Sequence, residues 1–314
     1  MIDNLLISVN SVVPFAFYIA FGYFSRRAGI TNESMLISFN KVSFQLFYPF
    51  LTFYNLYKAD FSNLQSARML LFCPIFLIAL TGFLLWLVPK LVRENSRRGV
   101  VIITIGRCNT LMLGLPLAFA VCGDAIALGI TLVTSIISVV SNALNVFVYS
   151  LFDQQDTEKR SFSLLRFIRN PLIVGLMIGL LFQLLRLKLP QCLLTPVSAI
   201  SAMASPLALF ILGGSLMLSD MRDNRRCLAW ICLIKLLLLP AFALALAWLI
   251  GIRGMDLFCV LIVFGTPTAA SSYSLAQAMN QDAALNSEIV VLTTVLSIFS
   301  LFVWVFLFKS AGLV

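Results

Sequence analysis

Runs of apolar residues follow one another along nearly the whole chain, with short polar connections between them. Each run is about 20 residues long, which is the length of helix that crosses the hydrocarbon core of a bilayer. Hydrophobic residues make up 61% of the 314 residues and charged residues only 11%, whereas soluble domains carry about 25% charged residues. The sequence therefore predicts an all-α polytopic membrane protein and excludes an ordinary soluble fold.

The hydropathy pattern predicts ten transmembrane helices, with no connection long enough for a soluble domain. Because the N-terminal segment lacks the basic region of a cleaved signal peptide, its apolar run is expected to be the first retained span. The ten spans are expected at about 5–24, 34–57, 68–89, 99–121, 125–150, 164–186, 194–218, 228–250, 256–279 and 284–308.

Lysine and arginine residues are unevenly divided between the two sets of connections that these spans define. The connections on one side hold most of them, and cytoplasmic loops carry such an excess. We therefore expect a multi-pass protein of the cell (cytoplasmic or inner) membrane with both termini outside the cytoplasm. The net charge of +9 does not indicate nucleic-acid binding, because the basic residues form no continuous face.

The residue types needed for metal binding or catalysis are scarce in this sequence. It has no histidine, which is the commonest metal ligand and the usual proton carrier near neutral pH. Its seven cysteines form no CxxC pair and mostly fall inside apolar runs, as small buried hydrophobic residues do. No nucleophile with a base and no nucleotide-binding loop is recognisable, so we expect no enzyme activity, no cofactor and no metal.

The two halves of the chain repeat each other at an offset near half its length. Since each half contains five predicted spans, an odd number, the second copy enters the membrane from the opposite side. The sequence thus predicts an inverted 5+5 repeat, with halves at 1–153 and 160–314, in which spans 4 and 9 cross near the midplane. The matching pairs are Pro14 with Pro171, Gly22 with Gly179 and Pro49 with Pro206, and near spans 4 and 9 the offset grows by one residue.

Spans 4 and 9 both contain residues that interrupt a helix. Glycine, asparagine, threonine and proline lie close together between Gly106 and Pro116, and the segment from Gly265 to Ser272 has the same character. Proline removes a backbone donor and clashes with the preceding turn, and in lipid the freed groups need other protein or a cavity. Matched interruptions in two halves indicate a transporter binding site, although two prolines that merely kink packed helices would leave the same pattern.

Helix ends that meet inside the bilayer favour an anion, because helix N-termini carry partial positive charge and free N–H groups. Hydroxyl and amide side chains around the interruptions supply donors without a carboxylate to repel an acidic substrate. The polar stripe of span 5 could face the same site or serve only as contact between helices. The predicted substrate-binding residues are Gln45, Thr52, Arg107, Asn109, Thr110, Gly114, Pro116, Pro267, Thr268, Ser271 and Ser272.

Two cations lie inside predicted spans. Arg107 is expected either to contact the substrate or a helix end, or to extend to the cytoplasmic surface, because it lies near the start of its span. Lys235 is expected to take the place of a coupling cation or to stabilise the carbonyl ends of the interrupted helices. No carboxylate lies centrally in span 4 or 9, which disfavours an antiporter that carries protons on buried aspartates.

The segment Asn109–Leu117, with the sequence Asn-Thr-Leu-Met-Leu-Gly-Leu-Pro-Leu, closely resembles the fourth-span motif of the auxin efflux carrier family. The lack of a long central loop makes the chain similar to the bacterial permeases of that family rather than to the plant auxin exporters. Further similarities are Phe39–Val42 before Pro49, Lys235 before Pro240, and Pro267 followed by Ala276 and Asn280.

The resemblance implies a substrate at the crossing near Asn109, Pro116 and Pro267 that moves by an elevator-like displacement, in a homodimer. Plant exporters have a second proline at the position of Ser272, so the interruption of span 9 is expected to be milder here. The implied scaffold domain comprises spans 1, 2, 6 and 7 (about 5–57 and 164–218), and the implied transport domain comprises spans 3–5 and 8–10 (about 68–150 and 228–308).

We therefore expect a secondary transporter of a small organic anion, such as malonate, malate or a similar carboxylate, that is oriented by Asn109. The alternative is a sodium or proton antiporter with the same crossed helices, and coupling of anion transport to protons or sodium stays open. A sensor built on a transporter scaffold would differ by showing no flux. The expected partners are the organic anion and the lipid bilayer, with no nucleic acid.

Overall fold

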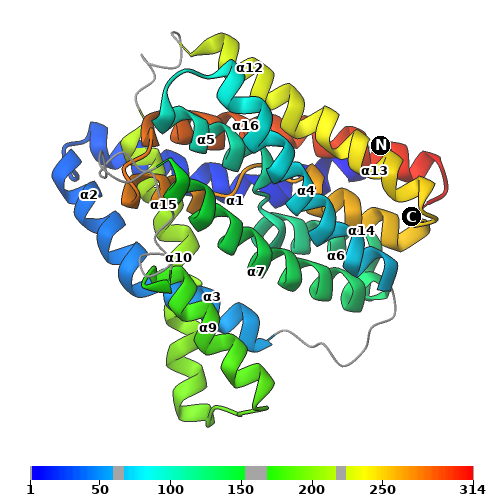
Figure 1. Ribbon diagram of the computed structural model, residues 1–314, viewed down its shortest axis with the longest axis horizontal. Helices are drawn as coiled ribbons and strands as arrows, with labels where there is room; N and C mark the ends of the chain where they lie inside the picture. Colours follow the sequence, from blue (N-terminus) through cyan, green and yellow to red (C-terminus); the bar gives the residue numbers. More distant parts are fainter. Residues whose placement is uncertain (1, 59–66, 153–167, 217–223, 314) are drawn as a thin grey trace.

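The computed structural model describes residues 2–58, 67–152, 168–216 and 224–313. Within these ranges the chain consists of helices and short connections, without a β-strand (Figure 1). The prediction of an all-α fold is therefore confirmed. The predicted boundary between the two halves, at residues 153–160, lies outside the described residues.

Helices occupy all ten of the ranges in which spans are predicted. In the first half they are α1 (Ile2–Arg27), α2 (Glu33–Val42), α3 (Tyr48–Lys58), α4 (Ala67–Leu91), α5 (Asn95–Gly106), α6 (Leu115–Cys122) and α7 (Ala127–Leu151). In the second half they are α9 (Pro171–Leu184), α10 (Gln191–Ser215), α12 (Arg225–Leu233), α13 (Leu239–Leu249), α14 (Gly254–Gly265), α15 (Ser271–Ala278) and α16 (Ala283–Ser310).

Six helical segments of the described chain are both long enough and apolar enough to cross a membrane. The predicted ninth span is not among them, because it is divided into α14 and α15, and α9 has only 14 described residues. The count of ten spans therefore stays a prediction. The six segments are Ala67–Leu91, Asn95–Cys122, Gly129–Leu151, Gln191–Ser215, Arg225–Leu249 and Ala283–Ser310.

The distribution of side chains is that of a membrane protein. Large apolar side chains such as Trp86 and Leu249 are 60% and 78% exposed, whereas Thr268 and Asn286 are completely buried. Lipid tails solvate apolar groups well and offer no hydrogen bonds, so polar groups gather inside the protein. The outer surface of this fold therefore suits a bilayer.

A π-helical turn precedes three of the prolines. Each turn ends two residues before the proline, whose ring would clash with the carbonyl group four residues earlier in a regular α-helix. Widening the helix to bonds between residues i and i−5 relieves this clash without breaking the helix. The turns are η1 (Ser43–Phe47) before Pro49, η2 (Thr110–Gly114) before Pro116 and η4 (Ile234–Leu238) before Pro240.

Two glycines bring helices of the first half against helices of the second half. A Cβ atom on Gly22 in α1 would lie 1.9 Å from the carbonyl oxygen of Phe210 in α10, and a Cβ atom on Gly179 in α9 would lie 3.0 Å from that of Phe53 in α3. Small residues allow such close approach of helices in membranes. The two contacts correspond to each other, because Gly179 follows Gly22, and Phe210 follows Phe53, at the same offset that relates the two halves of the sequence.

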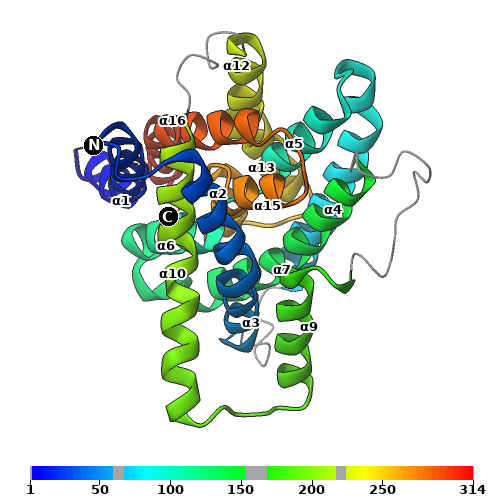
Figure 2. The same cartoon turned by 90° about the vertical axis from the view of Figure 1, so that its left-hand side faces the viewer.

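The helices form two groups with many contacts inside each. Helices α1, α3, α9 and α10 form one group, and α9, the start of α10 and the loop between them project from the rest of the molecule (Figure 2). Helices α4, α5, α7 and α12–α16 form the other group, and α1 and α16 pack against each other where the two groups meet. The start of α1 and the end of α16 lie at the same end of the molecule (Figure 1).

Candidate functional site

The fourth predicted span is interrupted just before its motif, at residues 107–109. Helix α5 ends at Gly106, Arg107 has an extended backbone (φ −81°, ψ 128°), and the chain becomes helical again at Thr110. Pro116, which the sequence suggests as the point of interruption, instead occupies the second position of α6. The non-helical segment is thus the three residues directly before the π-helical turn. The proline accounts for the widened turn and not for the interruption.

The ninth predicted span is interrupted at residues 266–270. Helix α14 ends at Gly265, and Thr266 is extended (φ −73°, ψ 151°). An extended conformation is expected there, because a residue that precedes proline is sterically excluded from the α region. Helix α15 then begins at Ser271.

The two interruptions contact each other directly. The backbone N–H of Asn109 donates to the carbonyl oxygen of Pro267 at 2.9 Å, and Arg107 Nη2 donates to Ser271 Oγ at 2.5 Å. Gly114 packs against α14 so closely that a Cβ atom there would lie 2.7 Å from Ile262 Cγ2. The segments are therefore positioned by backbone and side-chain contacts together.

The C-terminal end of α5 has partners for all four of its last carbonyl groups, which a helix by itself leaves unsatisfied. The carbonyl oxygen of Thr104 accepts from Thr268 Oγ1 at 2.8 Å, and that of Ile105 accepts from Lys235 Nζ at 3.1 Å. Those of Ile103 and Gly106 accept from the backbone N–H of Arg107 and from Cys108 Sγ. The interrupted helix end is stable inside the protein because each carbonyl group that the helix end frees has a hydrogen-bond partner.

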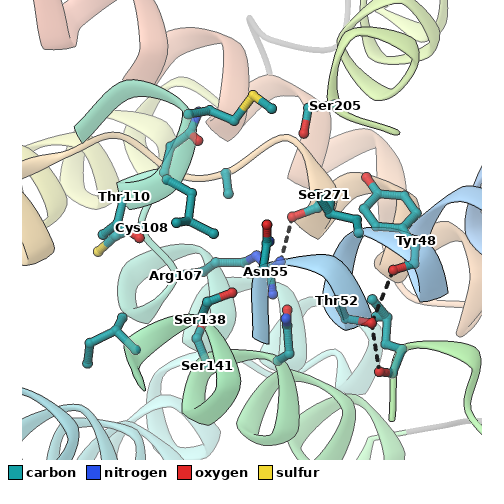
Figure 3. Close-up of a pocket in the computed structure, with 18 of the residues that line it drawn as sticks. Tyr48, Thr52, Asn55, Arg107, Cys108, Thr110, Ser138, Ser141, Ser205 and Ser271 are labelled. Carbon is teal, nitrogen blue, oxygen red and sulfur yellow. Dashed lines mark hydrogen bonds between the residues drawn. The ribbon is translucent and has the colours of Figure 1, made fainter. Parts of the chain in front are cut away.

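A cavity of about 280 Å³ lies beside the interruptions and between the two groups of helices (Figure 3). The Arg107 side chain reaches into its middle, with Ser271 on one side and Ser138 and Ser141 on the other. Its described lining residues are Tyr48, Leu51, Thr52, Asn55, Arg107, Cys108, Asn109, Thr110, Leu111, Met112, Leu115, Ile137, Ser138, Ser141, Asn142, Leu172, Ser205, Ala269 and Ser271.

Arg107 gives this cavity its charge. The residue is only 8% exposed, and its Nε and Nη1 atoms are buried with no hydrogen-bond partner in the structure. None of the described residues that line the cavity is acidic, and arginine stays protonated in proteins. The site therefore carries one positive charge with unused donors, so that it attracts an anion.

Several predicted site residues line this cavity, namely Thr52, Arg107, Asn109, Thr110 and Ser271. Others lie behind it and support the two interruptions. Thr268 bonds to the end of α5, and Ser272 Oγ donates to the carbonyl oxygen of Ala269 and lies 2.9 Å from Asn286 Oδ1. Pro267 and Gly114 form the contact between the interruptions.

Two predicted residues lie elsewhere. Gln45 is exposed and lines a separate cavity together with Asn40, Lys41 and Gln277. Lys235 is completely buried, but its ammonium group contacts Ile105 and, at 2.8 Å, Cys108 Sγ rather than the cavity. It lies at the carbonyl end of the interrupted helix α5.

The cavity also contains polar residues outside the predicted site. Ser138, Ser141 and Asn142 come from α7, and the polar stripe of span 5 in the sequence signals them. Asn55 comes from α3 and Ser205 from α10, and Ser205 is brought to the cavity only by the arrangement of the helices. For metal ions, no group of three or more Cys, Asp or Glu side chains of the described chain comes close enough together to hold one.

These features define the class of protein. Two interrupted helices that meet beside a polar cavity, in a chain with several membrane-crossing helices, are typical of a multi-pass membrane transporter. The chain belongs to the membrane transport protein family, whose sequence profile matches residues 7–161 and 157–305. This family is of the auxin efflux carrier type, so the resemblance of the fourth-span motif is confirmed.

A curated relative has the same character. It is a protein of Methanothermobacter thermautotrophicus that is described as an uncharacterized transporter, and it is 22% identical to this chain over 300 residues. The similarity covers 95% of this chain and 97% of that protein. The two proteins are therefore similar over nearly their whole lengths, and both comparisons indicate a transporter rather than an enzyme.

Proposed function

We propose that this protein is a secondary transporter of a small organic anion, with a carboxylate bound in the cavity between the two interrupted helices. The observation that carries the proposal is the buried guanidinium of Arg107, whose Nε and Nη1 atoms have no hydrogen-bond partner and which no acidic residue of the described lining balances. A buried cation without a partner is costly, and a carboxylate can accept two parallel hydrogen bonds from a guanidinium group. Ligand binding therefore removes the least favourable feature of the empty site.

The remaining polar groups would orient the ligand. Asn109 lies at the interruption of span 4, and the amides of Asn55 and Asn142 enter the cavity from α3 and α7. Amide and hydroxyl groups can donate hydrogen bonds to a carboxylate and to polar substituents. Leu51, Met112 and Leu172 add apolar wall, which suits the carbon skeleton of an organic acid.

The architecture that we propose is a ten-span inverted repeat with an elevator-like mechanism. The glycine contacts support it, since Gly22 against Phe210 and Gly179 against Phe53 are the same contact made twice with the roles of the halves exchanged. In this proposal α1, α2, α3, α9 and α10 form the scaffold. The second group of helices carries the interruptions and moves against the scaffold, and the cavity lies between the two groups.

The cellular setting follows from the same proposal. We propose a homodimer in the cell membrane with both termini outside the cytoplasm. The start of α1 and the end of α16 lie at the same end of the molecule (Figure 1), which an even number of spans requires. A sodium or proton antiporter of the same architecture needs a carboxylate at the site, and the described lining contains none, so anion transport is the better-supported function.

The test is flux through the purified protein in liposomes. A panel of mono- and dicarboxylates with two to six carbons is first screened by thermal shift, and uptake of the best binder is then measured. Asn109→Ala and Arg107→Gln should each abolish transport, whereas the exposed Arg93 offers a matched control, Arg93→Gln, which should transport normally. If no acid of the panel binds and none is transported, the proposal is rejected. Unchanged flux in Asn109→Ala would remove that residue from the site.

A further inference from the structure

The cavity is charged only by Arg107 among the described residues that line it. The other buried cation of this region, Lys235, points to the carbonyl oxygen of Ile105 at the end of α5. A helix C-terminus carries partial negative charge, so Lys235 is compensated where it lies. Without a ligand, the site therefore has one uncompensated positive charge.

The surroundings of Arg107 do not compensate this charge. Within the described ranges its hydrogen-bond partner is the neutral hydroxyl of Ser271, which is the first residue of α15. A helix N-terminus carries partial positive charge, so the guanidinium group faces the unfavourable end of that helix. An anion placed there interacts favourably with both Arg107 and the start of α15.

From these observations, and resting on the proposed function, we infer that the substrate is a monovalent carboxylate and that the protein works as an exchanger. One carboxylate neutralises Arg107 and makes the loaded site electrically neutral. A second carboxylate on the same ligand would find amides, hydroxyls and apolar side chains but no second cation in the described lining. An uncompensated charge in such a site is strongly disfavoured.

The exchange mode follows from the charge of each state. When the mobile helices carry a bound monoanion, the pair of charges crosses the low-dielectric region as a neutral unit. When they return empty, Arg107 has to cross as an isolated cation, and this costs far more. Return with a second anion from the opposite side avoids this cost, so exchange is faster than net transport.

The charge of each state also determines how the transport rate depends on the membrane potential. In net transport the empty return step moves the charge of Arg107 through the membrane potential, so the rate depends on voltage. The ceiling is about 50-fold for one elementary charge across 100 mV, because that work is about 2.3 kcal/mol. In exchange, no step moves Arg107 without a bound anion, so the rate responds less to voltage than the rate of net transport does.

Ligand charge is tested with acids of equal carbon number. Pyruvate and malonate, butyrate and succinate, and hexanoate and adipate form pairs with one and two negative charges at pH 7.5, and binding to the solubilised full chain is measured calorimetrically. We expect the monocarboxylate of at least one pair to bind at least tenfold more tightly than its dicarboxylate. Equal or tighter binding of the dicarboxylate in every pair that binds overturns the inference but leaves anion transport standing, whereas no binding in any pair rejects both.

Exchange is tested in liposomes with the best-binding monocarboxylate, labelled, at potentials of zero and about 100 mV set by potassium and valinomycin. We expect exchange against the same unlabelled acid to be at least tenfold faster than net uptake, and net uptake to change more with voltage than exchange does. Arg107→Lys keeps the charge, so exchange should still be faster than net uptake in this variant. In Arg107→Gln any residual exchange and net uptake should have equal rates. The control Arg93→Gln should match the unsubstituted protein. Net uptake as fast as exchange, or exchange that responds to voltage as strongly as net uptake, overturns the inference even where anion transport is observed.

Discussion

The backbone N–H of Asn109 donates a hydrogen bond to the carbonyl oxygen of Pro267 at 2.9 Å, so that the two interrupted segments are joined at their matching positions. The bond satisfies a donor that the interruption of span 4 frees and an acceptor that the interruption of span 9 frees. In lipid neither group would find water. Each interruption is therefore stable because the other is present.

Gly114→Ala tests the contact between the interruptions. The new methyl group would lie 2.7 Å from Ile262 Cγ2 and 3.3 Å from Thr266 Cγ2, so the π-helical turn η2 and α14 have to separate. We expect a destabilisation of about 1–3 kcal/mol, which is typical of overpacking, together with reduced flux, measured by thermal unfolding in detergent and by transport in liposomes. Gly82→Ala is the control, since a Cβ atom there meets nothing within 4 Å. If the added Ile262→Ala fails to restore Gly114→Ala, this explanation is wrong.

Gly22→Ala and Gly179→Ala test the paired glycine contacts between the halves. The Cβ atom at Gly22 would collide with the backbone oxygen of Phe210, whereas the one at Gly179 would only press on that of Phe53. We expect a lower thermal unfolding midpoint for both variants, with the larger decrease for Gly22→Ala. Equal stability of Gly22→Ala and the unsubstituted protein would contradict the close approach of α1 and α10.

Lys235→Met tests the stabilisation of the end of α5. The substitution keeps the length of the side chain but leaves the buried carbonyl oxygen of Ile105 without its donor, at a cost of about 1–3 kcal/mol. We expect a lower unfolding midpoint, whereas Lys188→Met, at an exposed lysine, should change it little. A neutral outcome for Lys235→Met would mean that the ammonium group has another role.

Trp304→Phe tests the π-helical turn before Pro240. Trp304 Nε1 donates to the carbonyl oxygen of Leu236 at 3.0 Å, which is the group that the proline ring displaces. Losing this bond should cost about 1 kcal/mol or somewhat more, because the carbonyl group is left unpaired inside the protein. The control is Trp86→Phe on the outer surface, where the indole is exposed, and the measurement is again the thermal unfolding midpoint. Equal effects of the two substitutions would show that the bond is unimportant.

The sequence predicts much of the framework because the relevant forces are local. Apolar runs locate the helices, and clusters of helix-breaking residues locate the interruptions, including the neighbourhood of Asn109 and Pro267. Arg107 can be recognised from the sequence because a cation inside an apolar run has a high free-energy cost in the membrane, whatever direction its side chain takes. These features depend on the residue types themselves.

Other parts of the site depend on the packing of distant helices. Ser205 enters the cavity and Gln45 does not, although Gln45 is close in sequence to Pro49 and Thr52. The extra residue of η1 changes the direction of the side chains that follow it, and periodicity counted along a regular helix does not anticipate this. Pro116 likewise predicts a disturbed helix without distinguishing a widened turn from an open chain.

The widened turn η1 also lets the continuous helical segment α2–η1–α3 contact two different neighbouring helices. One residue corresponds to about 100° of rotation around a helix, so the side chains before η1 and those after it face different directions. Asn40, before the turn, donates to the carbonyl oxygen of Ser274 in α15, whereas Thr52, after it, donates to that of Leu172 in α9. Under the proposed elevator mechanism, this one segment therefore contacts the scaffold helix α9 at one depth and the mobile helix α15 at another, so the surface on which the two groups slide runs along the segment.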